Sequence, residues 1–257
     1  YGFRLNRSCK DACEQISADL SLKESAQWVL EGDIKGCFDN ISHDWMLKNI
    51  PMDKNVLNQF IKAGYVFQRK LFPTSKGAIQ GGAISPTLAN LALDGMEQHI
   101  WNSINIGKKG IVKTKNLHKV HMIRYADDFI VTGDSKETLE KVKKCIISFM
   151  AIRGLELSEE KTLITNIHDG FDFLGWNFRK YNHKLIIKPS RKSIKSFSDM
   201  LTETVRYYLP APQELLILKL NQMLRGWCNY HSAVCSKDTF EKMDFLLFKK
   251  LLKKKKK

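Results

Sequence analysis

Hydrophobic and polar positions repeat with two different spacings along the chain, and the pattern changes near residue 190. Before that point, short apolar runs typical of buried strands occupy 28–34 (WVLEGDI), 171–178 and 183–189. Segment 121–133 (HMIRYADDFIVTG) predicts a strand, a tight turn and a second strand. Because apolar residues flank the turn on both sides, we expect a hairpin whose two arms are buried.

Helical patterns separate these strands. Segment 135–154 predicts an amphipathic helix that runs from a serine cap to a glycine. A helix broken by Pro51 is expected over 44–63. The apolar positions of 88–101 are spaced as on one helix face, after a glycine-rich loop at 76–86. The order of strand, helix, hairpin, helix and strand predicts an α+β fold in which helices cover one face of a sheet.

The spacing of apolar residues predicts helices throughout residues 190–257. Apolar side chains recur at every third or fourth position along two helices: Leu216, Leu220, Met223, Trp227 and Tyr230 on the first, and Phe240, Met243, Leu247 and Leu251 on the second. Trp227 and Tyr230 continue the apolar stripe, so we interpret them as helix-packing core rather than as platforms for base stacking. The change of pattern predicts two regions, 1–189 and 190–257.

The composition narrows the class of protein. The 257 residues are 43% hydrophobic, which excludes collagen-like and wholly disordered chains. No apolar run approaches the roughly 18 residues that a membrane-spanning helix needs. None of the six cysteines forms a Cys-x-x-Cys pair or a zinc-ligand cluster, a pattern typical of reduced thiols in a cytoplasmic protein. We therefore expect a cytoplasmic location, and the residues do not indicate an oligomeric state.

Positive charge is concentrated at one end of the chain. The formal net charge is +15, of which residues 179–257 carry +13 and residues 1–178 only +2. A nearly neutral body with a basic appendage is typical of a folded platform that binds a polyanion. The basic residues lack the strongly apolar opposite face that lies in lipid, so the expected polyanion is nucleic acid rather than a membrane.

Three acidic residues are candidates for chemistry. Asp33 follows a buried strand, and Asp127 and Asp128 occupy the turn of the hairpin. Neighbouring carboxylates repel each other near a core unless a cation compensates them, and purely oxygen ligands suit Mg²⁺. Two such ions about 4 Å apart can stabilise both the attacking and the leaving oxygen of a phosphoryl displacement.

Short motifs along nearly the whole chain resemble those of one enzyme family. YADDF at 125–129 is similar to the catalytic hairpin of reverse transcriptases, and GDIKGCFDNISHD at 32–44 is similar to their first catalytic motif. Further matches, in family order, are GFRLNRSCKDA (2–12), AIQGGAISPTLAN (78–90), GLELSEEKT (154–162), FDFLGW (171–176) and LRGWCNY (224–230). Together these motifs resemble the reverse transcriptase–maturases of bacterial group II introns.

The resemblance implies a fold and an activity. The fold would be a polymerase palm, an antiparallel sheet with helices on one face, followed by an all-helical thumb or maturase region. Residues 1–189 would form a remnant of the fingers and the palm, and 190–257 an incomplete thumb or maturase (X) region. The activity would be RNA-directed synthesis of DNA from dNTPs on an RNA template with a DNA primer, together with binding of intron RNA and assistance in its splicing.

The resemblance also assigns roles within the site. Asp33, Asp127 and Asp128 would hold two Mg²⁺ ions, for which Mn²⁺ could substitute. Lys161 would protonate the leaving pyrophosphate as a general acid, although a plain surface lysine is an almost equally good interpretation. Phe38 would stack beneath the incoming sugar and exclude a 2′-hydroxyl. The remaining nucleotide-binding residues would be Ile34, Gln80 and Gly81.

Basic residues at both ends would contact nucleic acid. Arg4 and Arg7 would either contact the template backbone or lie as ordinary surface charges. The helical region would supply phosphate contacts from Arg225, Lys237, Lys242, Lys249 and Lys250. Binding of this kind weakens steeply with salt, because phosphate contacts release counterions.

Two departures from the family pattern keep alternatives open. Ile79 stands where such enzymes usually carry proline, and the motifs open inside the second or third conserved block, so most of the fingers region is expected to be missing. One alternative is a maturase that binds RNA without polymerising. Another is a reverse transcriptase of a different prokaryotic lineage, of the retron or diversity-generating type. Retention of the acidic residues with Phe38 and Gln80 favours a polymerase.

Overall fold

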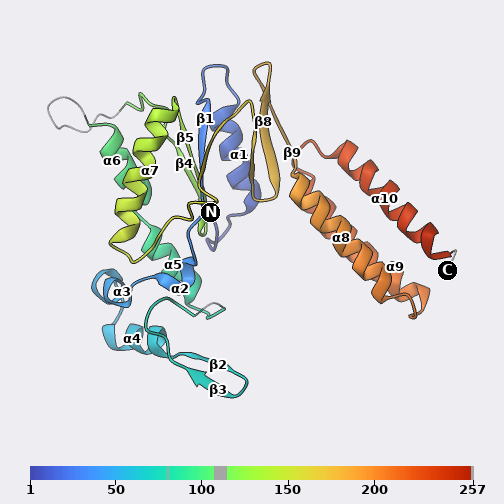
Figure 1. Cartoon of the computed structure of the whole chain (residues 1–257), viewed down its shortest axis with the longest axis horizontal. Helices are drawn as coiled ribbons and strands as arrows, with labels where there is room; N and C mark the ends of the chain where they lie inside the picture. Colours follow the sequence, from blue (N-terminus) through green and yellow to red (C-terminus); the bar gives the residue numbers. More distant parts are fainter. Residues whose placement is uncertain (80, 107–114, 256–257) are drawn as a thin grey trace. The chain divides into compact units, whose positions relative to one another are not determined.

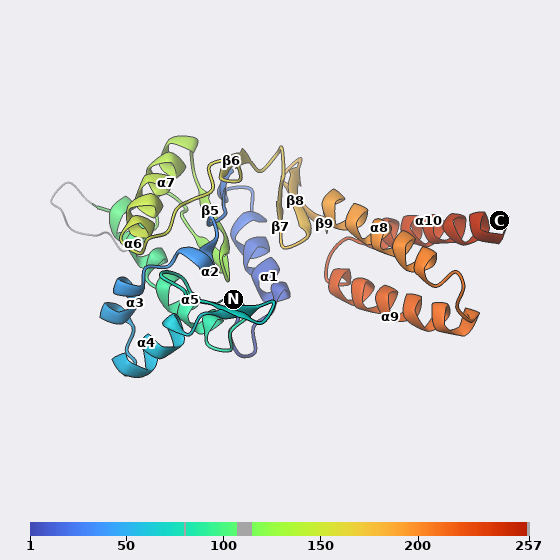
Figure 2. The ribbon, with the colours of Figure 1, turned by 60° about the horizontal axis from the view of Figure 1, so that its bottom comes forward.

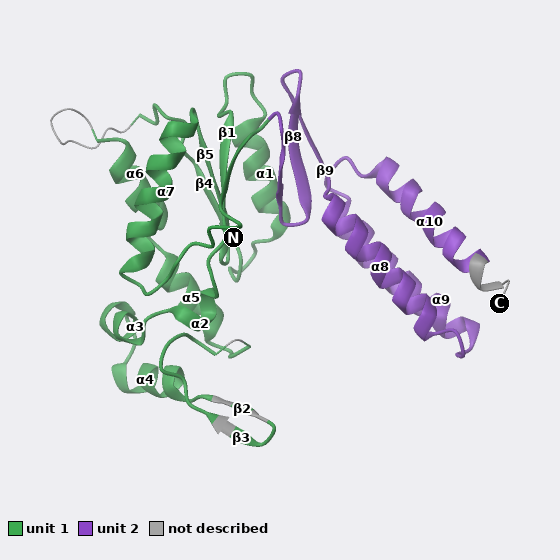
Figure 3. Ribbon diagram, in the orientation of Figure 1, with its two compact units in different colours: residues 1–167 green, residues 168–257 purple. Residues whose placement is uncertain are grey.

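The computed structural model describes residues 1–79, 81–106 and 115–255. The chain divides into two compact units, Tyr1–Ile167 and His168–Lys257 (Figure 3). The first unit contains the candidate catalytic residues, and the second contains the basic helices.

The centre of the first unit is a four-stranded sheet. Its spatial order is β4 (Met122–Tyr125), β5 (Asp128–Gly133), β1 (Trp28–Gly32) and β6 (Leu163–Asn166). Every pairing is antiparallel, so the predicted hairpin is β4–β5 and the earliest strand in the sequence, β1, lies between two strands that follow it much later. The α+β class and the antiparallel palm are confirmed.

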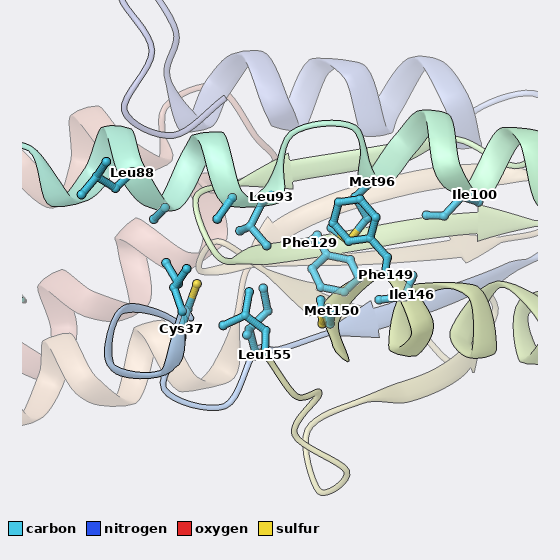
Figure 4. Packing of buried hydrophobic residues seen from close by; sticks show 14 of the residues in the cluster. Cys37, Leu88, Leu93, Met96, Ile100, Phe129, Ile146, Phe149, Met150 and Leu155 are labelled. Atoms are coloured by element: carbon cyan, nitrogen blue, oxygen red, sulfur yellow. The ribbon is translucent and has the colours of Figure 1, made fainter. Parts of the chain in front are cut away.

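Helices that the sequence predicts cover one face of this sheet. Helix α7 (Lys136–Ala151) begins at the predicted cap, where the Ser135 hydroxyl accepts a hydrogen bond from the Thr138 amide. Helices α5 (Ser85–Leu93) and α6 (Met96–Ile104) lie beside it. Figure 4 shows side chains of α6 and α7 gathered around Phe129 of β5, whose exposed fraction is 1%. The apolar side chains of α7 therefore form one side of the main core.

The other face of the sheet is also covered. Helix α1 (Cys9–Leu20) packs on β4, and Ile16 and Leu20 are fully buried. Figures 1 and 2 show α1 and α7 on opposite sides of the sheet. The prediction that helices cover one face of the sheet therefore holds for α5–α7, whereas α1 covers the other face. The pattern that marks α1 is short: Ser8 caps the helix, and Asp11 completes a capping box.

Segment 88–101 forms parts of two helices rather than one. Helix α5 ends at Leu93 with Asp94 as its C-cap, and Gly95 takes a left-handed φ of +86° before α6 begins. A single glycine is compatible with a helical pattern in sequence, but its freedom at positive φ allows the chain to change direction here. The apolar positions still face the core, because both helices pack on the same side of the sheet.

Short elements fill the region between β1 and α5. They are α2 (Cys37–Asn40), α3 (His43–Asn49), α4 (Lys54–Lys62) and the hairpin β2 (Tyr65–Phe67) with β3 (Lys70–Phe72). The predicted break at Pro51 is confirmed, since α3 and α4 end and begin on either side of it. The β2–β3 hairpin was not expected from the sequence.

The second unit combines a small sheet with three helices. Strands β7 (Phe171–Phe173), β8 (Trp176–Tyr181) and β9 (Lys184–Pro189) pair antiparallel, and helices α8 (Arg191–Tyr207), α9 (Gln213–His231) and α10 (Lys237–Lys255) follow. Trp176 is fully buried and stacks on Tyr230 of α9 at 4.7 Å, and the Tyr230 hydroxyl donates to the Leu174 carbonyl at 2.7 Å. These contacts join the sheet to the helices, which explains why the compact units divide after Ile167. The boundary at 189 between sequence regions stays a prediction.

The helical core includes four residues at predicted positions, Leu216, Leu220, Met243 and Leu247. Phe197 and Leu201 of α8, which the sequence pattern does not single out, complete it. Trp227 stacks on Phe197 with ring centroids 4.6 Å apart and planes 1° from parallel. Trp227 and Tyr230 therefore serve as packing residues, as the apolar stripe predicts. No described helix combines the length and hydrophobicity that a membrane span requires.

A buried histidine in this unit makes stability depend on pH. His231 is 1% exposed, lies against Trp227 at 4.6 Å, and burial lowers its pKa to about 4. The unfolded chain binds this proton near pH 6.5, so the neutral form stabilises the fold above that pH. We expect up to about 3 kcal/mol of the unit's unfolding free energy to be lost as pH falls from 6.5 to 4.

Urea unfolding of the whole chain at several pH values between 7.5 and 4.5 measures this loss. The His231→Phe variant is the control, because it removes the titrating group and leaves the other histidines to titrate. The wild type should lose more stability than the variant over this range. Parallel curves for the two proteins would contradict the assignment.

Candidate active site

Three segments that are far apart in the sequence meet at the end of the palm sheet. They enclose a cavity of about 280 Å³, whose lining includes Asp33, Phe38, Asp127, Ser158 and Lys161. Asp33 follows β1, Asp127 lies in the β4–β5 turn, and Ser158 and Lys161 precede β6. The antiparallel order of the sheet therefore brings three of the four predicted catalytic residues, Asp33, Asp127 and Lys161, to one place.

Backbone packing fixes the position of Asp33. Gly32, the residue before it, pairs with Phe129, and a Cβ atom built on Gly32 would lie 2.1 Å from the Phe129 ring. The chain after β1 is also held, because the Ser158 amide donates to the Asp33 carbonyl oxygen at 2.9 Å. The Lys161 ammonium donates to Oδ2 of Asp33 at 3.2 Å and is itself largely exposed. Lys161 therefore reaches the site from the solvent side.

The two neighbouring aspartates of the hairpin have different surroundings. The turn consists of Ala126 and Asp127, since Tyr125 and Asp128 are the last paired residues. Asp127 is half-buried and lines the cavity, whereas Asp128 is exposed and does not. The structure therefore brings Asp33 and Asp127 together and leaves Asp128 outside. In the described part of the chain, no group of three or more His, Cys, Asp or Glu residues is placed to hold a metal ion. The three-carboxylate site stays a prediction.

The chemistry of Asp33 and Asp127 is compatible with Mg²⁺. Asp33 already attracts a cation, the Lys161 ammonium, to one of its oxygens. Protein sites for Mg²⁺ commonly use one or two carboxylates, while water and substrate phosphates supply the remaining oxygens. Asp33 and Asp127 therefore meet the minimum that such an ion requires from the protein.

Phe38 and the glycine-rich loop are joined by main-chain contacts. The Ala78 amide donates to the Phe38 carbonyl oxygen at 2.6 Å, and the Gly77 amide donates to that of Ile41 at 2.7 Å. A Cβ atom on Gly77 would lie 2.5 Å from the Phe38 carbonyl oxygen, so this approach requires glycine. The ring of Phe38 lines the cavity and meets Phe3 edge-on at 6.5 Å. The start of the glycine-rich loop is therefore hydrogen-bonded to the main chain of Phe38, the residue predicted to select the sugar.

The other predicted nucleotide-binding residues differ in what the structure shows of them. Gln80 lies outside the described residues. Gly81 is exposed, and a Cβ atom added to it would meet no other atom within 4 Å. Ile34 is 4% exposed and pairs with Leu157, so only its main chain is available to a ligand. The Cys37 thiol, which also lines the cavity, stays protonated, because burial raises its pKa to about 12 and the Asp127 carboxylate adds to the effect.

The predicted nucleic-acid-binding residues are distributed over both units. In the first unit, Arg4 forms an ion pair with Asp94 at 2.9 Å, and Arg7 lies over the Tyr1 ring at 5.8 Å. In the second unit the side chains are exposed in all cases but one: Arg225, Lys237, Lys242 and Lys249 face solvent, and Lys250 is half-buried. Lys250 donates to the Thr202 hydroxyl, so it contributes to helix packing. Contacts of these residues with nucleic acid stay predictions.

One residue near the candidate site, Arg124, is not among the site residues that the sequence motifs predict. Arg124 precedes the YADD sequence, its side chain is 13% exposed, and its guanidinium donates to the Ala126 carbonyl oxygen within the β4–β5 turn. The available signal is a single positively charged residue within the mostly apolar segment 122–131. A buried arginine needs several partners, so such a residue indicates a polar network around the turn.

Comparisons with known proteins show the family to which the chain belongs. Residues 1–178 match the family described as reverse transcriptase (RNA-dependent DNA polymerase), and residues 194–257 match the group II intron maturase-specific domain. The chain is 27% identical to the group II intron-encoded protein LtrA of Lactococcus lactis subsp. cremoris, over 90% of this chain and 52% of that protein. It is 31% identical to protein YkfC of Escherichia coli strain K12, over 74% of this chain and 56% of that protein. The chain thus spans about half the length of these relatives.

Solved structures show the same fold at low identity. Apo telomerase from Candida tropicalis has a TM-score of 0.54 and 16% identity, over 97% of this chain and 50% of that chain. Telomerase from Candida albicans has a TM-score of 0.51 and 14% identity, over 91% and 42%. These likenesses support the palm-type fold, and the family follows from the sequence matches. The chain belongs to the reverse transcriptase family and carries a group II intron maturase-specific domain.

Proposed function

We propose that this chain is the RNA-directed DNA polymerase of a group II intron. A primer 3′-hydroxyl would attack the α-phosphate of a dNTP, form a new phosphodiester bond and release pyrophosphate. The observation that carries the proposal is one cavity that contains Asp33, Asp127, Phe38 and Lys161. A protein that only binds RNA has no need for two carboxylates, an aromatic residue and a lysine in one cavity.

Each residue has a separate part in the proposed reaction. Asp33 and Asp127, with Asp128 as a third ligand, would hold two Mg²⁺ ions or Mn²⁺ in their place. When bound, these ions neutralise charge on the triphosphate and favour the ionised primer hydroxyl. Lys161 lies at the mouth of the cavity, 3.2 Å from Asp33, where it would transfer a proton to an oxygen of the departing pyrophosphate. Most of the rate enhancement would come from positioning and charge stabilisation.

The Phe38 ring is expected to select deoxynucleotides. Because the Phe38 side chain packs against the main core and its ring meets that of Phe3, the ring has little room to withdraw from a 2′-hydroxyl. Phe38→Ala should lower discrimination against rNTPs by about tenfold to a hundredfold, a loss of roughly 1–3 kcal/mol of steric selectivity. Single-nucleotide incorporation of dTTP and UTP gives the ratio of kcat/KM. Phe248→Ala, which removes an exposed phenylalanine of α10 in the second unit, is the matched control. An unchanged ratio in Phe38→Ala would remove this residue from the selecting role.

The second unit supports a role in RNA binding. Residues 179–257 carry +13 of the net charge, and the maturase-specific domain matches 194–257. Intron RNA, or the hybrid of template and primer, would be held through phosphate contacts from the exposed side chains of α9 and α10. Assistance in splicing and a cytoplasmic location belong to the same proposal. The cysteine pattern supports that location.

Two other functions would use the same chain. A maturase without polymerase activity would need the second unit but not the cavity. A reverse transcriptase of another prokaryotic lineage would share the palm but would not need the maturase-specific domain. The presence of both the cavity and this domain favours the intron enzyme over either alternative.

Primer extension tests the proposal. The chain is incubated with poly(rA), oligo(dT), dTTP and Mg²⁺, beside an Asp127→Asn variant. Extension by the wild type alone would support a polymerase that uses this cavity. Extension by both proteins would place the activity elsewhere. Absence of extension together with salt-sensitive RNA binding would favour the maturase that does not polymerise.

A further inference from the structure

The strand that leads into the catalytic turn contains a buried cation, Arg124. Both terminal nitrogens of its guanidinium donate hydrogen bonds. Nη1 donates to the Ala126 carbonyl oxygen and to Oδ1 of Asn90, each at 3.0 Å. Nη2 donates to Oδ1 of Asp94 at 2.8 Å. One planar group therefore links the turn of the β4–β5 hairpin to helix α5.

The turn that Arg124 holds contains a strained residue. Ala126 has a φ of +56°, a region that two-residue hairpin turns usually fill with glycine or asparagine. A side chain costs about 1–2 kcal/mol in this left-handed region. Such a conformation persists only when its surroundings enforce it. The hydrogen bond from Arg124 to the Ala126 carbonyl oxygen supplies one such constraint.

The same hydrogen bond determines the orientation of Asp127. The Ala126 carbonyl and the Asp127 amide belong to one planar peptide group, so fixing the carbonyl oxygen also fixes the bond that leads to the Asp127 Cα atom. Rotation of this peptide would turn the Asp127 carboxylate away from Asp33 on the other side of the cavity. These hydrogen bonds of Arg124 do not go to the carboxylate of Asp33 or of Asp127, so its effect on Asp127 would pass through the backbone.

The other end of the network leads to the nucleotide loop. Asn90 and Asp94 belong to α5 and its end, and α5 follows directly from the glycine-rich loop that contacts Phe38. Asp94 balances the charge of Arg124 and also binds Arg4 at the surface. A single guanidinium thus connects the two parts that must meet around a nucleotide: the turn with Asp127 and the helix behind the loop.

We propose that Arg124 is a positioning residue, which holds the Ala126–Asp127 peptide so that the Asp127 carboxylate faces the cavity. The inference rests on the proposed polymerase function. It predicts that loss of the guanidinium slows the chemical step, while binding of dNTP and of nucleic acid is retained.

Single-turnover primer extension with Arg124→Met tests the inference. We expect the rate at saturating dTTP to fall by about tenfold or more, and KM for dTTP to stay within about threefold, because the lost interaction affects the transition state. Arg124→Lys keeps the charge but not the fork of donors, so it should be intermediate. In Arg124→Ala, a few millimolar guanidinium chloride should restore part of the rate, since 13% of the native side chain is exposed and the space can be entered. Sodium chloride at the same concentration should not.

Arg153 provides the matched control. It is also a half-buried arginine that binds α5, because its Nε donates to the Ala92 carbonyl oxygen at 2.7 Å and its Nη1 to that of Phe149 at 2.8 Å. These hydrogen bonds join α5 to α7 and do not involve the hairpin turn, so Arg153→Met should leave the single-turnover rate within about twofold. Guanidinium should not raise the rate of Arg153→Ala.

The outcomes separate this inference from the function on which it rests. If the wild type extends primers and Arg124→Met is slowed no more than Arg153→Met, the positioning role is wrong while the polymerase stands. If the wild type does not extend primers, the proposed function fails, and amide hydrogen exchange over residues 122–131 decides the role of Arg124. Faster exchange there in Arg124→Met than in Arg153→Met would support it, and equal exchange would overturn it.

Discussion

Asp127→Asn is expected to abolish DNA synthesis and to leave RNA affinity within about threefold, because one charge outside the basic helices contributes little to counterion release. The substitution keeps the shape of the side chain but removes a charged oxygen ligand from a cavity that holds one carboxylate from the hairpin turn and another from the end of β1. A loss of several kcal/mol of transition-state stabilisation corresponds to a rate reduced on the order of a thousandfold. Primer extension measures the rate, and filter binding to RNA measures the affinity.

Asp44→Asn is the control for this experiment. Asp44 is an exposed acid in the first turn of α3, so its substitution removes the same charge outside the cavity. The control should polymerise at the wild-type rate within about twofold, since an acid in a first helical turn contributes only a few tenths of a kcal/mol to stability. Loss of both synthesis and RNA binding in Asp127→Asn would indicate misfolding and would contradict the specific role of the carboxylate.

Gly32→Ala is expected to destabilise the first unit more than any surface change. The new methyl group would lie 2.1 Å from the Phe129 ring, which is 1% exposed and enclosed by side chains of α6 and α7. Overpacking of a closed core costs typically 1–3 kcal/mol, and a contact this short in a central strand should reach or exceed about 3 kcal/mol. Urea or thermal unfolding of the whole chain measures the change.

Two further variants test the cause. Phe129→Leu in the Gly32→Ala background removes the ring atoms that collide, so the double variant should be more stable than Gly32→Ala alone. Gly226→Ala places the same methyl group on α9, where no atom lies within 4 Å. It should stabilise the chain by up to about 1 kcal/mol through helix propensity. Failure of Phe129→Leu to relieve the effect would mean that the collision is not the source of the instability.

The sequence predicts the site better than it predicts the details of its surroundings. Apolar residues on both sides of the acidic pair indicate a buried hairpin, and the position of Asp33 after an apolar run indicates a strand end. Both patterns depend only on neighbours in sequence, which is why they can be read without a structure. The same reasoning holds for α7, whose serine cap and apolar stripe lie within one segment.

The remaining features depend on contacts between distant segments. The exposed position of Asp128 follows from strand pairing in the hairpin, where neighbouring residues face different surroundings. The proposed positioning role of Arg124 depends on hydrogen bonds to Asn90 and Asp94, which are about thirty residues away in the sequence. The turn at Gly95 depends on a backbone conformation that glycine permits but does not enforce. No local pattern contains this information.

The position of β1 at the centre of the sheet has a consequence for synthesis of the chain. A ribosome that has made β1 must add roughly 100 more residues before β5 exists and roughly 130 before β6 exists, which takes about 5–20 s and about 7–27 s at ordinary elongation rates. Until β5 is made, β1 has no native partner strand on either edge. Its residues Val29 and Leu30, which are fully buried in the folded chain, have no native sheet to pack in. Unpaired edges of this kind recruit other strands. We therefore expect the nascent chain to need protection of this strand, for example by a chaperone, until the hairpin emerges.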